Sequence, residues 1–423
     1  HLKSYGYKYN TSPNMDAIAL QGTLFKNAIS QAPWTYPSHA SMLTSQYPSV
    51  LGLLGSQGEA AANKLPTATK TLAEVLRKHG YNTAGIVDAP WLEARFGWSR
   101  GYSVYSEKNG EFEYEFQELE SSYQEAENWI IKHRNDKFFL FFHTFEVHGY
   151  EDPKKNAIFT ERLERHDDLE QQIAVYDGSI KRVDRYIGQL FNTLKTLKLD
   201  KDTLLIITSD HGEGFYEHGL GTHGNSLYDE LLKVPLILHM PGTVPENLIV
   251  ESQVRLIDVM PTILDILGLP LAKSLEGKPL RLFFKGKTEE LPAFSEAVSE
   301  IDSLINFYPT SLRLNKHKYI KFLEGEERIR VLEKMKSGSM AWVKSVYNKK
   351  PEHELYDLSI NPCELSNKKL NDPFLAKNLS ERINEFKKAN ALKKKYVRSK
   401  GPQKNVTLDE ELKNKLQALG YLQ

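Results

Sequence analysis

An aspartate and a histidine stand side by side at Asp210 and His211, directly after the apolar run 203–208. That run is rich in β-branched residues and predicts a buried parallel strand. The carboxyl end of such a strand is where open α/β sheets bind their ligands. A carboxylate and an imidazole are both metal ligands, and the neighbouring glycines allow a substrate to approach closely. Two more histidines, His218 and His223, follow within twelve residues, so the segment predicts a metal or anion site; the alternative is a plain turn with a capping aspartate.

The elements that must position this loop alternate between strands and helices over the first two thirds of the chain. Apolar runs predict strands and amphipathic spacing predicts helices. We expect strands at 83–87, 137–142, 203–208 and 234–238, and helices at 15–20, 38–44, 71–79, 113–133, 168–197, 227–232 and 254–267. The strand at 137–142 is expected to be fully buried. This alternation indicates an α/β fold with a doubly wound, mostly parallel sheet.

The pattern changes after about residue 286, where short strand-like pieces are separated by polar loops. They predict a smaller C-terminal antiparallel sheet with a helix over 371–389. The basic stretch 393–404 predicts a solvated linker, and an amphipathic helix over 409–422 would dock through its leucines, Leu412, Leu416 and Leu419. We therefore expect an α/β domain over 1–286, a small α+β subdomain over 287–392, and a linker with a docking helix over 393–423.

The composition limits the classes of partner. The 423 residues carry 55 Lys and Arg against 55 Asp and Glu, so the formal net charge is zero and nothing favours nucleic acid. No run approaches the 18 or so apolar residues of a membrane span. Cys363 is the single cysteine and says little about compartment. The sequence starts at His1 as if cut from a longer chain, so localisation and oligomeric state are left open.

Several segments together resemble the sulfatase branch of the alkaline-phosphatase superfamily, and the likeness runs nearly end to end. The segments that carry it are His1–Gly6, Thr11–Asp16, Ala32–Ser41, Phe139–His148, Asp210–Glu213, Asp258–Asp265 and Leu355–Pro362. The resemblance implies an alkaline-phosphatase-like fold. It also implies a metal-dependent hydrolase of sulfate or phosphate esters.

The nucleophile position departs from the family. Sulfatases carry Cys or Ser at the start of a short motif with Pro and Arg, and oxidise that residue to formylglycine. Here the same frame reads Thr35-Tyr-Pro-Ser-His39. Threonine cannot become formylglycine because its β-carbon carries a methyl group. A threonine hydroxyl can still attack an ester beside a metal, as in the phosphodiesterases and phosphoethanolamine transferases of the superfamily. The alternative is that Thr35 caps the helix near Ser38.

The expected metal ligands, by the same resemblance, are Asp210, His211 and Thr35. His211 stands where many sulfatases have Asn. An imidazole there favours Zn²⁺ or Mn²⁺, whereas the Ca²⁺ common in sulfatases prefers oxygen ligands.

Three other histidines are the expected substrate-binding residues: His39, His148 and His223. His148 matches the histidine that touches the transferring group in sulfatases, and His223 stands where they carry a lysine. Either His148 or His223 is expected to be the catalytic acid. His143 is interpreted as a buried histidine bonded to backbone.

Two further departures concern the anion pocket and the metal. The Lys-Trp-His-Leu-Gly segment of the family is replaced by Val87–Trp91, so the pocket has lost cations. In the family, the first metal-binding aspartates lie on a strand that ends just before the segment matched by 1–6. We therefore expect the 423-residue chain to hold a metal poorly and to be inactive, while its parent is a hydrolase.

The substrate is expected to be a small-molecule, glycan or lipid ester. One alternative is a transferase of phospho-alcohol groups such as phosphoethanolamine or phosphoglycerol. Another is a catalytically silent sulfatase-like protein.

Overall fold

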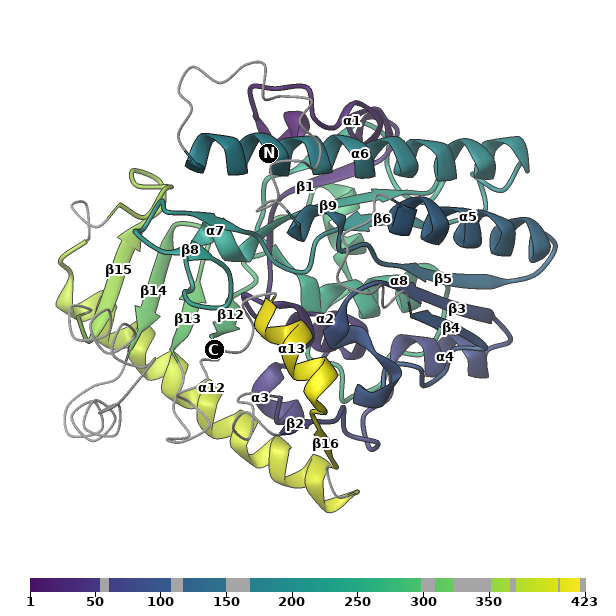
Figure 1. Cartoon of the computed structure of the whole chain (residues 1–423). Coiled ribbons are helices and arrows are strands. Elements are labelled where there is room, and N and C mark those ends of the chain that lie inside the picture. The colour runs from purple at the N-terminus through teal and green to yellow at the C-terminus, as the bar shows by residue number, and fades with distance from the viewer. Residues whose placement is uncertain are drawn as a thin grey trace.

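The computed structural model describes residues 1–53, 61–107, 117–149, 168–297, 309–322, 351–365, 370–401 and 404–418 (Figure 1). Its larger part is α/β, and a smaller antiparallel sheet follows in the chain. The predicted fold class is confirmed.

The largest sheet has the strand order β10-β1-β9-β6, with β11 also paired to β1. Its strands are β1 (Thr23–Ile29), β6 (Leu205–Thr208), β9 (Lys233–His239), β10 (Leu248–Val250) and β11 (Val254–Arg255). β10 and β11 run parallel to β1, but β9 is antiparallel to both β1 and β6. The strand predicted at 203–208 therefore exists, but the prediction that it pairs in parallel is wrong. An apolar run indicates that a strand is buried, but it does not indicate the direction of the strand beside it.

A second sheet, parallel throughout, has the order β4-β3-β5. Its strands are β3 (Asn82–Val87), β4 (Val104–Glu107) and β5 (Phe138–Phe142). The residues of β5 are only partly buried, so the expectation of a fully buried strand is wrong. The two sheets share one apolar core, because Phe139 and Phe141 of β5 pack on the same cluster as Ile206 and buried residues of β1 and β9.

Helices pack around these sheets. They are α1 (Pro13–Leu20), α2 (Thr35–Thr44), α3 (Pro48–Leu51), α4 (Leu72–Lys78), α5 (Gln117–Lys132), α6 (Asp168–Thr196), α7 (Asp229–Leu232) and α8 (Val259–Ile266). The 3₁₀ helices are η1 (Lys3–Tyr5), η2 (Pro90–Leu92), η3 (Ala94–Phe96), η4 (Glu146–His148), η6 (Leu256–Asp258) and η7 (Leu280–Lys285). The long helix α6 runs along the upper side of the molecule and packs on α1 and α5 (Figure 1).

The smaller sheet is antiparallel in the order β12-β13-β14-β15, as the sequence predicted. Its strands are β12 (Ala293–Glu296), β13 (Thr310–Arg313), β14 (His317–Lys321) and β15 (His353–Asp357). Helix α12 (Pro373–Ser399) packs on β13 and β14. This helix passes the predicted end at residue 389, so the stretch 393–399 is helical and not a linker. Lysine and arginine are good helix formers, and no Gly or Pro interrupts the run.

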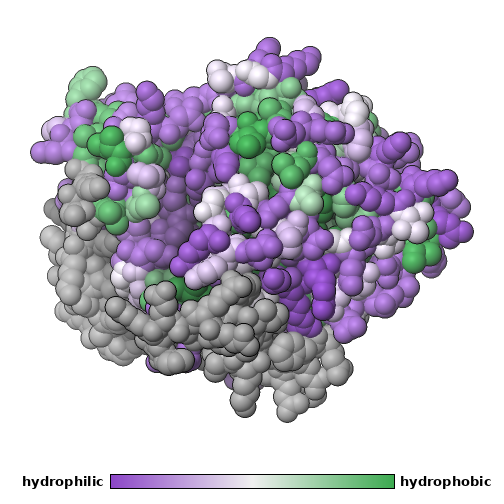
Figure 2. Space-filling view, turned by 90° about the horizontal axis from the view of Figure 1, so that it is seen from above, coloured by the Kyte–Doolittle hydropathy of each residue, from purple (hydrophilic) through white to green (hydrophobic). Residues whose placement is uncertain are grey.

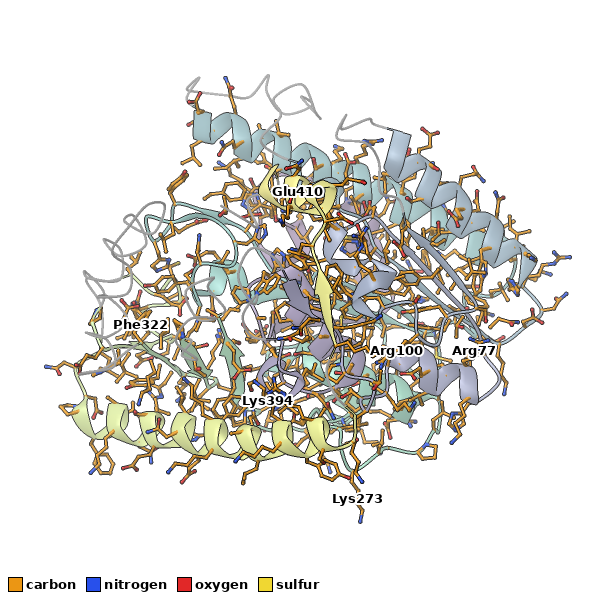
Figure 3. The ribbon with its side chains drawn as sticks, turned by 60° about the horizontal axis from the view of Figure 1, so that its bottom comes forward. Arg77, Arg100, Lys273, Phe322, Lys394 and Glu410 are labelled. Carbon is orange, nitrogen blue, oxygen red and sulfur yellow. The ribbon has the colours of Figure 1, made fainter. Side chains whose placement is uncertain are left out.

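The chain then forms β16 (Asn405–Thr407), which pairs with β2 (Ala61–Asn63), and the helix α13 (Glu410–Ala418). Figure 3 shows α13 lying over the α/β part, with Glu410 at its start and β16 leading to it. Leu412 is buried in the main core, so α13 packs on the α/β part through this side chain. The side chain of Leu416 and all of Leu419 lie outside the described residues.

The face seen from above is mainly hydrophilic, and its apolar residues form small groups among polar ones (Figure 2). Among the described helices, none is long and apolar enough to cross a membrane.

Candidate active site

Thr35 is the first residue of α2, which begins shortly after β1 and is buried along its whole length. The helix starts three residues earlier than predicted. Pro37 lies in its first turn, where a missing N–H leaves no intrahelical bond unmade. Thr35 is only 2% exposed, so its hydroxyl is held inside the protein.

The loop after β6 carries Asp210 and His211, at the edge that the sequence predicted. The Gly212 N–H donates to the Leu231 carbonyl, and a Cβ atom at position 212 would overlap the Glu230 carbonyl oxygen. Glycine is therefore required where this loop passes α7. The Ser38 hydroxyl of α2 donates to the Asp210 carbonyl at 2.6 Å, which ties the loop to the helix that carries Thr35.

The Thr35 hydroxyl and the His211 ring are direct neighbours: Oγ1 lies 3.3 Å from Nε2. Nδ1 of His211 is 2.8 Å from the Gly212 carbonyl oxygen, which can only accept a hydrogen bond. The Nδ1 atom must therefore carry the proton, and Nε2 presents a lone pair toward Thr35. Oδ2 of Asp210 lies 3.5 Å from the same Nε2.

His39 lies one turn after Thr35 on α2 and is also buried. Its Nδ1 is 2.9 Å from the Thr35 carbonyl oxygen and 3.3 Å from Oδ2 of Asp210. This ring therefore lies beside both the threonine backbone and the carboxylate.

His148 and His223 complete the cluster. His223 follows β8 (Gly221–Thr222), which pairs with β7 (Gly214–Phe215) in a two-stranded hairpin. Its ring stacks on His211 at 4.5 Å and meets His148 edge-on at 5.0 Å. Nδ1 of His223 is 3.1 Å from a carboxylate oxygen of Glu213. All six residues predicted for the site, Thr35, His39, His148, Asp210, His211 and His223, therefore lie together.

The ionisation of the cluster suits cation binding. Burial lowers the pKa of His39 to about 4, although Asp210 opposes the shift. Burial and then His223 lower the pKa of His148, and burial lowers the pKa of His211. Burial alone would raise the pKa of Asp210, but the surrounding imidazoles, His211 first, lower it below its usual range. At neutral pH Asp210 is therefore a carboxylate and His39, His148 and His211 are neutral imidazoles, and neutral imidazole is the form that ligates metals.

One carboxylate near the site, that of Asp88, was not identified from the sequence. Asp88, at the carboxyl end of β3, accepts a hydrogen bond from Nδ1 of His143 at 3.1 Å. His143 was expected to bond backbone, so its ring partner corrects that interpretation. Its ring lies 5.1 Å from that of His39. The signal available in the sequence was the position of Asp88 directly after a predicted strand.

Two pairs of these residues have the spacing that neighbouring metal ligands would have. Oδ2 of Asp210 is buried and makes no hydrogen bond within the described part of the chain. Two ligands at about 2.0–2.2 Å from a tetrahedral ion lie about 3.3–3.6 Å apart. The 3.3 Å from Thr35 to His211 and the 3.5 Å from His211 to Asp210 match that spacing. Among the described residues, however, no three His, Cys, Asp or Glu side chains form a group that could hold a metal. Asp210, His211 and Thr35 therefore fit one side of a metal shell.

The fold, with this site at the carboxyl ends of its strands, defines an alkaline-phosphatase-like α/β protein. The family model described as Sulfatase matches residues 1–269. The match covers more than half of the chain, which therefore belongs to the sulfatase family.

Individual relatives are distant. Arylsulfatase K of Bos taurus is 29% identical over 226 residues, which cover 50% of this chain and 35% of that protein. The chain therefore spans about a third of the length of arylsulfatase K.

Solved structures agree in fold. A protein in complex with its substrate D-glucosamine-2-N,6-O-disulfate superposes with a TM-score of 0.72 at 17% identity, covering 93% of this chain and 95% of that one. The phosphonate monoester hydrolase of Agrobacterium radiobacter superposes with a TM-score of 0.70 at 20% sequence identity. The match covers 92% of this chain and 93% of that one.

Proposed function

We propose that the protein is a metal-dependent hydrolase of sulfate or phosphate esters, with Thr35 as its nucleophile. The observation that carries the proposal is the 3.3 Å separation of Thr35 Oγ1 from Nε2 of His211, with Oδ2 of Asp210 beside them. A buried hydroxyl next to an acceptor and a carboxylate is the arrangement that an activated nucleophile requires.

The chemical step begins at Thr35. Its Oγ1 loses its proton to bulk water and forms a bond to the sulfur or phosphorus centre as the bond from that centre to the leaving oxygen breaks. Nε2 of His211 faces the hydroxyl and is oriented by the Gly212 carbonyl. A divalent ion held by Asp210, His211 and Thr35 would polarise the ester and stabilise the threonine oxygen as an alkoxide.

The leaving oxygen needs a proton, and we assign this role to His223. Glu213 contacts its Nδ1, which orients the ring and can stabilise a positive charge on it. His148 carries a pKa lowered by burial and by His223, so it is neutral at neutral pH. A neutral His148 can donate one hydrogen bond to an equatorial oxygen but is the weaker candidate for the acid.

His39 is proposed to support the site more than to bind the anion directly. With its pKa near 4 it carries no charge at neutral pH. Its Nδ1 lies against the Thr35 carbonyl and Asp210, so it positions the nucleophile turn and the carboxylate.

The ester formed on Thr35 is then cleaved by water. The water oxygen attacks sulfur or phosphorus and passes a proton to His223, which is neutral after protonating the leaving group. Oγ1 then leaves and regains a proton from bulk water. If an alcohol replaced water, the same step would transfer the group. The threonine and the likeness to a phosphonate monoester hydrolase therefore support a second candidate, a phospho-ester hydrolase or phospho-alcohol transferase.

The substrate class is proposed from a structural similarity, and the metal from the residue at position 211. The similarity to a protein solved with a sulfated glucosamine supports a sulfated glycan as one substrate class. An imidazole at position 211 favours Zn²⁺ or Mn²⁺, and Ca²⁺ is possible by family resemblance.

We further propose that this site alone binds its metal ion weakly. Asp210, His211 and Thr35 provide one carboxylate, one imidazole and a weakly acidic hydroxyl. Structural and catalytic zinc sites use three or four protein ligands of stronger character. Further oxygen ligands would be needed for tight binding.

The test is a panel of matched aryl sulfate, phosphate monoester and phosphodiester substrates, with Zn²⁺, Mn²⁺ or Ca²⁺ added after chelation. We expect the protein to cleave at least one ester only when metal is added. Metal-independent turnover would contradict the proposed function, and tight binding of any of these ions would contradict the weak affinity proposed for the site.

A further inference from the structure

His218 lies in the turn that joins β7 to β8, five residues before His223. Its side chain is 7% exposed, and the ring stacks flat on Tyr228 with 3.7 Å between centroids and 7° between planes. The ring is therefore fixed in orientation by the residue that precedes α7.

Both ring nitrogens of His218 face oxygen atoms that can only accept. Nδ1 is 2.7 Å from Oε1 of Glu230, and Nε2 is 3.0 Å from the main-chain carbonyl of Glu364. A neutral imidazole has one N–H, whereas an imidazolium has two. Both bonds form together only when His218 is protonated and charged.

The charges around the ring favour that state. Glu230 contacts it from α7, and the Glu364 carboxylate lies nearby, where it pairs with Lys318 of β14. Asp229 is paired with Lys318 and Arg313. Burial alone would lower the pKa of His218, but the hydrogen bond and charge of Glu230 raise it above its ordinary value.

The hairpin that carries His218 needs such an anchor. Tyr216 has φ 67° and Thr222 has φ 62°, in the left-handed region that non-glycine residues avoid. Each such residue costs about 1–3 kcal/mol and persists only where surrounding contacts enforce it. Thr222 is β-branched and directly precedes His223, so a relaxed turn would move His223.

We infer that His218 is a positioning residue whose charged ring ties the β7–β8 turn to α7 and to the segment around Glu364. The bridge holds the hairpin that leads to His223 at the site. Its effect on catalysis rests on the proposed function of His223. The charge of the His218 ring and the anchoring of the turn do not depend on that function.

The first experiment follows the ring nitrogens of uniformly ¹⁵N-labelled protein across pH, with His218→Gln assigning the signal. We expect His218 to stay doubly protonated above the ordinary histidine value of about 6.5. In Glu230→Gln, which keeps the histidine and removes the charge, it should titrate at lower pH. A neutral His218 at pH 6.5 in the wild type would overturn the inference.

The second measurement tests the anchoring. His218→Gln should shift the ring signals of His223 and His211, whereas His79→Gln, at an exposed helix end, should leave them unchanged. Unchanged His223 signals in His218→Gln would overturn the positioning role, whatever the turnover. If His218→Gln does not fold, the same comparison is made in Glu230→Gln at a pH above the titration of His218. Retained turnover in His218→Gln, with both NMR results as expected, would count only against the catalytic role proposed for His223.

Discussion

Oγ1 of Thr35 and Nε2 of His211 lie 3.3 Å apart although 176 residues separate them in the chain. The two atoms are brought together because α2 and the loop after β6 are joined through Ser38 and the Asp210 carbonyl. The contact places a hydroxyl against an imidazole lone pair, beside a carboxylate oxygen that has no hydrogen-bond partner among the described residues. The proposed role of Thr35 depends on this contact with His211.

Metal binding should depend on Asp210 and His211. A ligand at ten times its dissociation constant stabilises the folded state by about 1.4 kcal/mol. We expect Zn²⁺ or Mn²⁺ at high concentration to raise the melting temperature of the wild type, and Asp210→Asn or His211→Ala to abolish the rise. His79→Ala serves as the control, and an equal rise in Asp210→Asn would contradict the assignment.

Glu213→Gln should preserve the shape of the contact with His223 but remove its charge. If the carboxylate orients and stabilises the acid, kcat should fall about 10- to 100-fold with little change in KM. Steady-state kinetics of the wild type and the variant measure this. A rise in KM with unchanged kcat would instead indicate that Glu213 contributes to substrate binding.

Glu296→Gln should stabilise the protein at alkaline pH. Burial raises the pKa of Glu296 to about 7, so the folded state favours the protonated acid. The stability that this group contributes is complete below its unfolded pKa of about 4.3 and is lost as pH rises through 7. At pH 8 the variant should be more stable by up to about 3 kcal/mol, and near pH 4 the two should be nearly equal. Urea unfolding at both pH values checks this; a less stable variant at pH 8 would contradict it.

Much of the fold could be predicted because its signals are local. The helix near residue 72 begins with Thr71 and Glu74 bonded in a reciprocal capping box, and its amphipathic spacing was clear in the sequence. The pairing of β6 with β9 could not be predicted, because an apolar run reports burial without direction. A helix was expected over 254–267. The helix instead starts at Val259, so Pro261 lies in its first turn, where proline is tolerated.

The part of the site that lies in recognisable motifs at strand ends could be predicted. Asp210 and His211 could be chosen from their position alone, and Thr35 from the family frame. The contact between Asp88 and His143 joins two separate strand ends and has no local signature. The two partners of the His218 ring come from residues 12 and 146 positions away, so its charge could not be foreseen.

Lys318→Met should destabilise the smaller sheet. The ammonium group is fully buried and pairs with Asp229 at 2.8 Å and Glu364 at 2.7 Å. Removing one partner of a buried ion pair leaves an uncompensated charge and costs about 3–5 kcal/mol. Lys273→Met, at a side chain that projects from the surface (Figure 3), should change stability by less than about 0.5 kcal/mol. Chemical denaturation of both variants tests this, and a similar small effect in Lys318→Met would show that the network contributes little.

The role of Thr35 is tested by comparing Thr35→Ala and Thr35→Ser with the wild type, on the ester that the wild type cleaves best. Alanine removes the attacking oxygen, whereas serine retains it without the methyl group. We predict that kcat/KM falls by about three orders of magnitude or more in Thr35→Ala and by about tenfold or less in Thr35→Ser. Retained turnover in Thr35→Ala would contradict the assignment of Thr35 as the nucleophile.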